Sequence, residues 1–215
     1  MASIMIHLQA AHRLLQPGGL LCGKIIHPSN YYLGVIAPDS VNLDGFAEKE
    51  IRWSAHLRAK TPKEWYQNIG TFYQKQQDKS DHDLLLGYII HNITDAAFDE
   101  TLHNPIWTAS SKADASPSKD VNDSGWEECY RYDFSQRNES WWTQEVMPAL
   151  AQSKVEKINK LSASQIERWR DYLLKGYMDT LEKSAPKVIT KEMVWLLGDY
   201  VEFICKKILT KKGNF

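Results

Sequence analysis

Residues 84–103 read LLLGYIIHNITDAAFDETLH, and this stretch carries the densest set of potential metal ligands in the chain. Its apolar residues suit a core helix, yet ionisable side chains recur at every fourth position: His91, Asp95, Asp99 and His103. Residues four apart on an α-helix lie about 40° apart around its axis, so these four side chains form a slowly winding ridge. Imidazole nitrogen and carboxylate oxygen are both zinc ligands. The pattern fits either a metal-binding helix or a polar stripe satisfied by neighbouring helices, and a single His-x-x-x-Asp pair favours the second.

Helical periodicity extends to most of the chain, with no internal repeat and no convincing strand hairpin. Thr61-Pro62-Lys63-Glu64 is a strong helix start, and Ser80 is a plausible N-cap for the helix quoted above. Residues 48–59 fit either a helix or an irregular crossing. The predicted helices are 3–15, 28–37, 62–77, 81–103, 126–137, 141–153, 164–183 and 190–211. We therefore predict an all-α, single-domain multi-helix bundle that spans residues 1–215.

Composition excludes several classes of protein. The 215 residues are 43% hydrophobic and 25% charged, which are ordinary values for a globular protein. The formal net charge of −1 argues against nucleic-acid binding through a basic patch. The first residues lack the basic start and apolar run of a signal peptide, and no apolar run approaches the roughly 20 residues of a transmembrane helix. We expect a cytoplasmic protein, and the oligomeric state stays open.

The segment from Ala109 to Gly125 is rich in Ser, Asp, Lys and Ala and has no periodicity. Such a composition is typical of an exposed, mobile loop rather than of a linker between domains. Because the segment follows the predicted metal-binding helix, we expect it to lie near any pocket at that helix.

Three further residues are candidate ligands. His7 lies on or beside the apolar face of the first helix, Asp39 follows a short buried helix in Pro-Asp-Ser, and His56 follows Trp53 by three residues. Each has an ordinary structural interpretation: a core histidine bonded to a carbonyl, or a turn residue. A helical bundle can bring side chains from separate helices to one site, but sequence spacing alone does not show that they converge.

The order of these motifs resembles the zinc-dependent phospholipase C family. The resemblance rests on four motifs: HLxxA at His7, YYLGVIAPDS with Asp39, AHL with His56, and LGYIIHNITD, which contains His91 and Asp95. It covers about residues 4–103, whereas the second half of the chain is similar only in being helical. The family is all-α and related in fold to the P1-type nucleases, and this chain resembles its short, uncharacterised bacterial members.

The resemblance implies a metal site made of identified residues. Asp39, His56, His91 and Asp95 would form one zinc site, and His7 would bind a neighbouring metal ion with Asp95 as the bridge. Two departures argue against a third ion. The sixth residue after Asp95 is Thr101 rather than the family's histidine, and no HxxxE motif occurs downstream. We therefore expect one or two zinc ions. Asp99 and His103 could substitute for the missing ligands, and Asp133 in YRYDF is a candidate extra ligand.

The expected activity is metal-assisted hydrolysis of a phosphate ester, of the phosphodiesterase or phospholipase C type. Zinc lowers the pKa of bound water towards neutrality and so supplies hydroxide. Asp39 would act as a ligand or as a general base. The substrate would be a small-molecule phosphate ester or a phospholipid head group.

Two other hypotheses stay open. The chain could be a non-catalytic, metal-stabilised helical binding protein, or the polar residues could serve a purely structural core. Four aromatic residues could line a substrate pocket, although core packing is the more common role of such side chains. These residues are Tyr31, Tyr32, Trp53 and Trp65.

Overall fold

A computed structural model describes residues 2–113, 121–181 and 183–210, and in these ranges the chain forms ten α-helices, short 3₁₀ and π segments and no strand. The predicted all-α class is confirmed. The α-helices are α1 (Ile4–Leu15), α2 (Pro28–Ile36), α3 (Lys49–Ala55), α4 (Pro62–Gln76), α5 (His82–Thr101), α6 (His103–Ala113), α7 (Val121–Ser135), α8 (Met147–Ala151), α9 (Ala163–Lys175) and α10 (Lys191–Thr210). The 3₁₀ segments are η1 (Ala37–Asn42) and η3 (Tyr177–Thr180), and the π-helix is η2 (Trp141–Val146).

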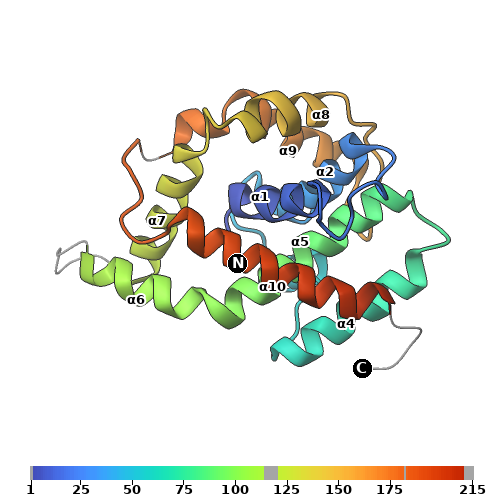
Figure 1. The fold of residues 1–215 in the computed structure, drawn as a ribbon, viewed down its shortest axis with the longest axis horizontal. Helices are drawn as coiled ribbons and strands as arrows, with labels where there is room; N and C mark the ends of the chain where they lie inside the picture. The colour runs from blue at the N-terminus through green and yellow to red at the C-terminus, as the bar shows by residue number, and fades with distance from the viewer. Residues whose placement is uncertain (1, 114–120, 182, 211–215) are drawn as a thin grey trace.

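Helix α5 is the central element of the fold (Figure 1). Every residue from Asp83 to Phe98 is buried, so neighbours cover this helix on all sides. Its N-cap is Asp81, whose carboxylate accepts a hydrogen bond from the backbone N–H of Leu84 at 2.8 Å. The prediction of Ser80 as the cap is therefore wrong by one residue. A carboxylate at this position also interacts favourably with the helix dipole.

Helices α2 and α5 cross with their backbones in direct contact. A Cβ atom at Gly87 would overlap the carbonyl oxygen of Tyr31, and a Cβ at Gly34 would overlap that of Leu84. Only glycine permits so close an approach at both positions. The crossing places the carbonyl of Val35 within 2.6 Å of a ring nitrogen of His91. These two glycines therefore determine how closely α2 approaches the polar residues of α5.

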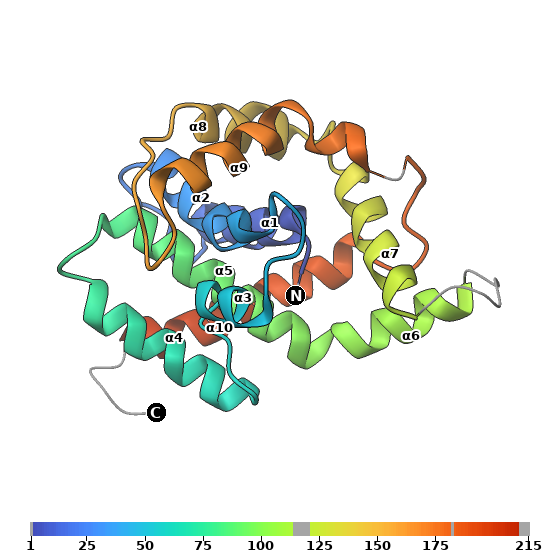
Figure 2. The same cartoon turned by 180° about the vertical axis from the view of Figure 1, so that it is seen from behind.

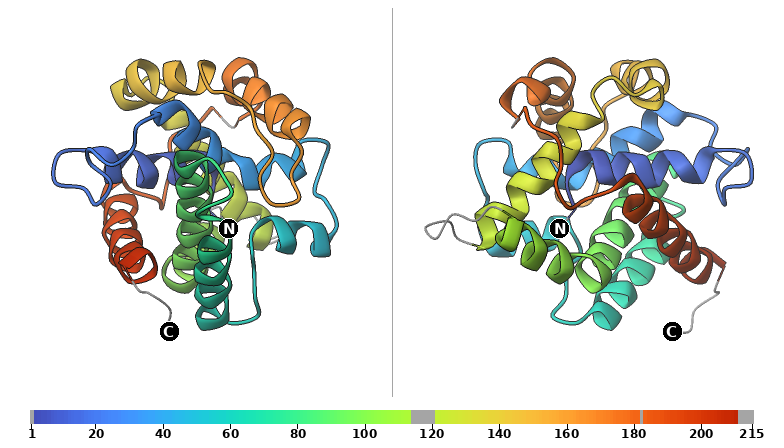
Figure 3. Two further views of the ribbon diagram at one scale, coloured as in Figure 1. Left: turned by 90° about the vertical axis from the view of Figure 1, so that its right-hand side faces the viewer. Right: turned by 60° about the vertical axis from the view of Figure 1, so that its left-hand side comes forward.

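The remaining helices surround this pair. Helices α1 and α10 pack on α5 and on each other, and α4 covers another side of α5. Figure 2 shows α8 and α9 along the edge opposite α4, and Figure 3 shows α7 beside the start of α1. None of the helices in the described ranges is long and apolar enough to cross a membrane.

The predicted start of α4 is confirmed, and two later helix predictions are corrected. Helix α4 begins with a complete capping box, in which Thr61 Oγ1 accepts from the N–H of Glu64 and the Glu64 carboxylate accepts from the N–H of Thr61. Within residues 48–59 the chain forms α3 followed by a turn. The predicted helix 164–183 is too long, because α9 ends at Lys175 before Gly176 and η3 follows. The predicted helix 141–153 is the π-helix η2 followed by α8.

The predicted exposed loop at 109–125 is largely wrong. Helix α6 runs through Asn104-Pro105 to Ala113, and α7 begins at Val121, while residues 114–120 lie outside the described ranges. Packing between the two helices explains the difference. Gly125 lies directly against the ring of Trp107, so α6 and α7 approach closely despite their polar composition. Such tertiary contacts override weak helix propensity.

Candidate metal centre

Five side chains selected from the sequence meet in one cluster at the middle of the fold. His7 comes from α1, Asp39 from η1 and His56 from the residue after α3, while His91 and Asp95 are one turn apart on α5. Four of them are completely buried, and the side chain of Asp39 is 15% exposed. Burying so many ionisable groups is costly unless they are paired with one another or bind a metal ion.

The donor atoms form two overlapping groups. One ligand atom from each of His7, His91 and Asp95 lies within 4.8 Å of the others, and the same is true of Asp39, His56 and His91. The rings of His7 and His91 are stacked, with centroids 3.7 Å apart. Bonds from zinc to nitrogen or oxygen are about 2.0–2.2 Å, so the ligand atoms of a tetrahedral ion lie about 3.4 Å apart. The atoms of each group would move closer together to hold an ion.

Hydrogen bonds orient two of the imidazoles. The Nδ1 atom of His56 lies 2.8 Å from the carbonyl of Arg52, and that of His91 lies 2.6 Å from the carbonyl of Val35. Because a carbonyl only accepts, each Nδ1 carries the proton and donates it. The Nε2 atoms therefore point into the cluster as potential ligands. Metal-binding histidines are typically held in this way.

Several atoms of the cluster lack a hydrogen-bond partner in the described part of the chain: both ring nitrogens of His7, Nε2 of His91 and Oδ2 of Asp95. An unsatisfied buried polar atom costs about 1–3 kcal/mol. Nε2 of His7 and Nε2 of His91 lie 3.2 and 3.7 Å from the carboxylate of Asp95, and the lone pairs of these atoms are ones that a cation would accept. These residues therefore fit the metal that the family resemblance implies.

Asp95 lies between the two groups. Its Oδ1 atom is 3.2 Å from Nε2 of His7, and its Oδ2 atom is 3.7 Å from Nε2 of both His56 and His91. The backbone N–H of Ala2 also donates to Oδ1 at 2.8 Å. The two oxygens therefore face different histidines, as a carboxylate that bridges two ions would.

Burial and mutual charge set the protonation of the cluster. Burial alone would raise the pKa of both carboxyl groups, but the histidines around them lower the pKa of Asp39 and bring that of Asp95 well below its usual range. Burial and the neighbouring His7 lower the pKa of His91 to about 4. His56 behaves differently. Burial would lower its pKa, but the hydrogen bond to Asp39 and the charge of Asp95 raise it above the ordinary 6.5.

Metal affinity is expected to fall as the pH is lowered through the pKa of His56. In the metal-free protein, protonated His56 donates from Nδ1 to Arg52 and from Nε2 to Asp39 at 3.2 Å. A metal ion at Nε2 must displace that proton. Since the pKa is raised, the loss begins above pH 6.5 and continues below it, by roughly tenfold per pH unit for one displaced proton. Competition with a chromogenic chelator between about pH 8 and 5.5 measures this dependence. Constant affinity over that range would show that His56 is not a ligand.

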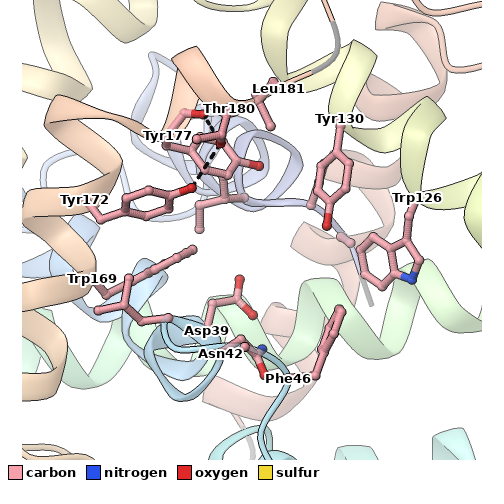
Figure 4. A pocket seen from close by; sticks show the side chains of 15 residues that line it. Asp39, Asn42, Phe46, Trp126, Tyr130, Trp169, Tyr172, Tyr177, Thr180 and Leu181 are labelled. Atoms are coloured by element: carbon pink, nitrogen blue, oxygen red, sulfur yellow. Dashed lines mark hydrogen bonds between the residues drawn. The ribbon is translucent and has the colours of Figure 1, made fainter.

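Asp39 joins the cluster to a pocket of about 380 Å³. Figure 4 shows its carboxylate pointing into this cavity from η1, with Trp169 and Tyr172 on one side and Trp126 and Tyr130 on the other. The described lining residues include no Lys, Arg or His. The pocket is therefore aromatic, and its lining carries one acidic group and no cation.

The other ligand candidates do not join the cluster. Asp99 forms an ion pair with Arg58, and His103 is half-buried and stacks on Trp107 with ring centroids 4.2 Å apart. Asp133 is buried, but its two oxygens accept hydrogen bonds from Ser3 and Tyr177. These side chains are committed to other partners.

The pocket aromatics differ from those considered in the sequence. Tyr31, Tyr32 and Trp65 are buried in the hydrophobic core, which confirms core packing, and Trp53 does not line this pocket. The rings that do line it come mostly from the second half of the chain: Trp126, Tyr130, Trp169, Tyr172 and Tyr177, together with Phe46. A cluster of aromatic residues on α9 and η3 was the only available signal. It did not distinguish a pocket from core packing.

A comparison with models of protein families finds no match to this chain, and comparisons with curated proteins and with solved structures find none either.

Proposed function

We propose that this protein is a metal-dependent hydrolase of phosphate esters, of the phosphodiesterase or phospholipase C type that the sequence resembles. One observation carries the proposal. A buried cluster of three histidines and two aspartates, with unsatisfied donor atoms, is joined through Asp39 to an aromatic pocket. Most buried polar atoms in proteins have a hydrogen-bond partner, and four donor atoms of this cluster have none in the described part of the chain.

The proposed ligands divide between two ions. Asp39, His56 and His91 would hold one ion and His7 the other, with Asp95 between them. Zinc bound there would supply hydroxide at neutral pH and stabilise the negative charge that develops on the phosphate. His91 and Asp95 lie in the fully buried stretch of α5 between Asp83 and Phe98, which suits a site that must keep its geometry.

The absence of cations in the described lining of the pocket supports a role for metal ions in substrate binding. A phosphodiester is anionic, and the charged side chain that it would meet is the carboxylate of Asp39. Without bound cations the two would repel each other. With one or two divalent ions at the base of the pocket, the local charge becomes favourable for a phosphate.

Asp39 is placed to act on the attacking water. Its side chain is the part of the cluster that lines the pocket. It would orient a water molecule towards the phosphorus and accept its proton. The aromatic walls would hold the substituent of the ester, since planar or apolar groups pack well on such rings.

Hydrolysis of bis(p-nitrophenyl) phosphate tests the proposal. The protein, stripped with a chelator and then loaded with Zn²⁺ or Mn²⁺, is expected to release nitrophenolate, and removal of the metal should stop turnover. The variant Asp39→Asn should lower kcat by roughly 10²–10⁴-fold if Asp39 is the base, and its metal content must equal that of the wild type for this role to stand. Bound metal without turnover under any loading condition would instead support a non-catalytic metal-binding protein. Failure to bind metal would leave a purely structural core.

A further inference from the structure

A second buried carboxyl group lies beside the pocket, separate from the metal cluster. Asp133 on α7 is completely buried. Its Oδ1 atom accepts a hydrogen bond from Ser3 Oγ at 2.6 Å, and its Oδ2 atom accepts one from the hydroxyl of Tyr177 at 2.5 Å. A backbone hydrogen bond from Met5 completes its surroundings. All of these donors are neutral, which is unusual for a buried carboxylate.

Tyr177 connects Asp133 with the pocket. Its side chain is 7% exposed in relative terms, belongs to the pocket lining, and lies across the cavity from Asp39 in Figure 4. Asp39 is the proposed base for the attacking water. In an in-line displacement the leaving group departs on the side opposite the attacking water, so a proton donor is needed across the pocket from the base.

We propose that Tyr177 is the general acid of the reaction and that Asp133 supplies its proton. This inference rests on the proposed phosphodiesterase function. As the bond from phosphorus to the leaving oxygen breaks, the Tyr177 hydroxyl gives its proton to that oxygen and an alcohol leaves. The carboxyl group of Asp133 then passes its own proton to the phenolate oxygen. Asp133 regains a proton from water at the end of the cycle, and no oxidant or further reactant is needed.

The environment of Asp133 keeps a proton available near neutral pH. Burial raises the pKa of this carboxyl group to about 7, even though the hydrogen bonds from Ser3, Tyr177 and the backbone of Met5 oppose the shift. The titratable group that faces it from α1 is His7, and Tyr177 faces it from η3. Cys129, Tyr130 and Tyr132 are the titratable neighbours on its own helix.

The direction of the hydrogen bond depends on this proton. When Asp133 is ionised, the Tyr177 hydroxyl donates its proton to the carboxylate, and that proton does not point to the pocket. When Asp133 is protonated, it can donate to the phenolic oxygen, and the Tyr177 proton is free to turn towards a substrate. General-acid catalysis should therefore weaken as the pH rises through the pKa of Asp133.

Two substrates of nearly equal shape test the role of Tyr177. Bis(p-nitrophenyl) phosphate loses a stable nitrophenolate, which needs no proton, whereas bis(p-nitrobenzyl) phosphate loses an alkoxide, which does. In the zinc-loaded protein, Tyr177→Phe is expected to lower kcat for the benzyl ester at least about 100-fold and to change kcat for the phenyl ester less than about threefold. Tyr200→Phe is the matched control, since that hydroxyl bonds to Glu100 and the residue does not line the pocket. It should affect both esters alike and weakly.

The possible outcomes separate this inference from the proposed function. Equal losses on both esters in Tyr177→Phe would mean a structural role and overturn the inference. Wild-type turnover of the phenyl ester without any turnover of the benzyl ester would overturn it too. If neither ester is hydrolysed by the zinc-loaded protein, the proposed hydrolase function is itself contradicted.

A spectroscopic experiment tests the proton reservoir without turnover. Infrared difference spectra between the metal-free wild type and Asp133→Asn should contain the band of a protonated carboxyl group that titrates near pH 7. In Tyr177→Phe the band should shift, because one hydrogen bond to the group is lost. In the zinc-loaded protein, Asp133→Asn should also remove the alkaline decline in benzyl-ester turnover. A carboxylate that stays ionised from about pH 5 to 8 would overturn the role of Asp133 whatever the activity.

Discussion

Replacing Asp95 by asparagine is expected to weaken metal binding at least about 100-fold, a larger loss than the 10–100-fold typical of changes outside the ligand shell. Asp95 faces His7 with one oxygen and both His56 and His91 with the other. The amide keeps the shape of the side chain but removes the negative charge and one acceptor. Elemental analysis of the purified variant and chelator competition measure the stoichiometry and the affinity.

Asp99→Asn is the matched control for this experiment. It makes the same chemical change one turn later on the same helix, where the carboxylate pairs with Arg58 outside the cluster. Its metal content should equal that of the wild type. Zinc at about 100 times its dissociation constant should stabilise the wild type and Asp99→Asn by about 2.7 kcal/mol, and Asp95→Asn should gain almost nothing. Equal metal content in all three proteins would exclude Asp95 as a ligand.

Replacing Gly87 by alanine is expected to destabilise the protein by about 3 kcal/mol or more, at or beyond the upper end of ordinary overpacking. The new methyl group would overlap the carbonyl oxygen of Tyr31, which is backbone and cannot move aside as a side chain does. Helices α2 and α5 would have to separate. Because that movement also withdraws the Val35 carbonyl from His91, metal affinity should fall together with stability.

Gly176→Ala provides the comparison for this substitution. At this helix end an added Cβ would meet its nearest atom, a ring carbon of Tyr172, at 3.7 Å, which is ordinary contact. We expect its free energy of unfolding to stay within about 1 kcal/mol of the wild type. Urea denaturation followed by circular dichroism measures both variants. A Gly87→Ala protein as stable as Gly176→Ala would contradict the close backbone contact between α2 and α5.

Some features follow from the sequence because they depend on local geometry. The four-residue spacing of His91 and Asp95 places both on one face of a helix wherever that helix lies. The Thr61 capping box and the all-α class likewise follow from residues close in the chain. Helix geometry also explains why Asp99 does not join the cluster. It lies about 80° around the helix axis from His91 and pairs with Arg58 instead.

Other features depend on contacts between distant residues, and only the tertiary structure decides them. His7, Asp39 and His56 converge on α5 from three other segments, and no periodicity encodes that convergence. Gly34 and Gly87 let α2 and α5 meet at their backbones. The polar residues 109–113 and 121–125 are helical because α6 and α7 pack on each other.

The pocket belongs to this second group as well. Tyr177 and Trp169 line it from the second half of the chain, whereas Asp39 belongs to the first half. The family resemblance covers only the first half and could not place these two aromatic residues. The sequence by itself determined which side chains could bind a metal and that helices would carry most of them. Which of these face a common space was decided by tertiary packing, because the energy of long-range contacts outweighs local preference.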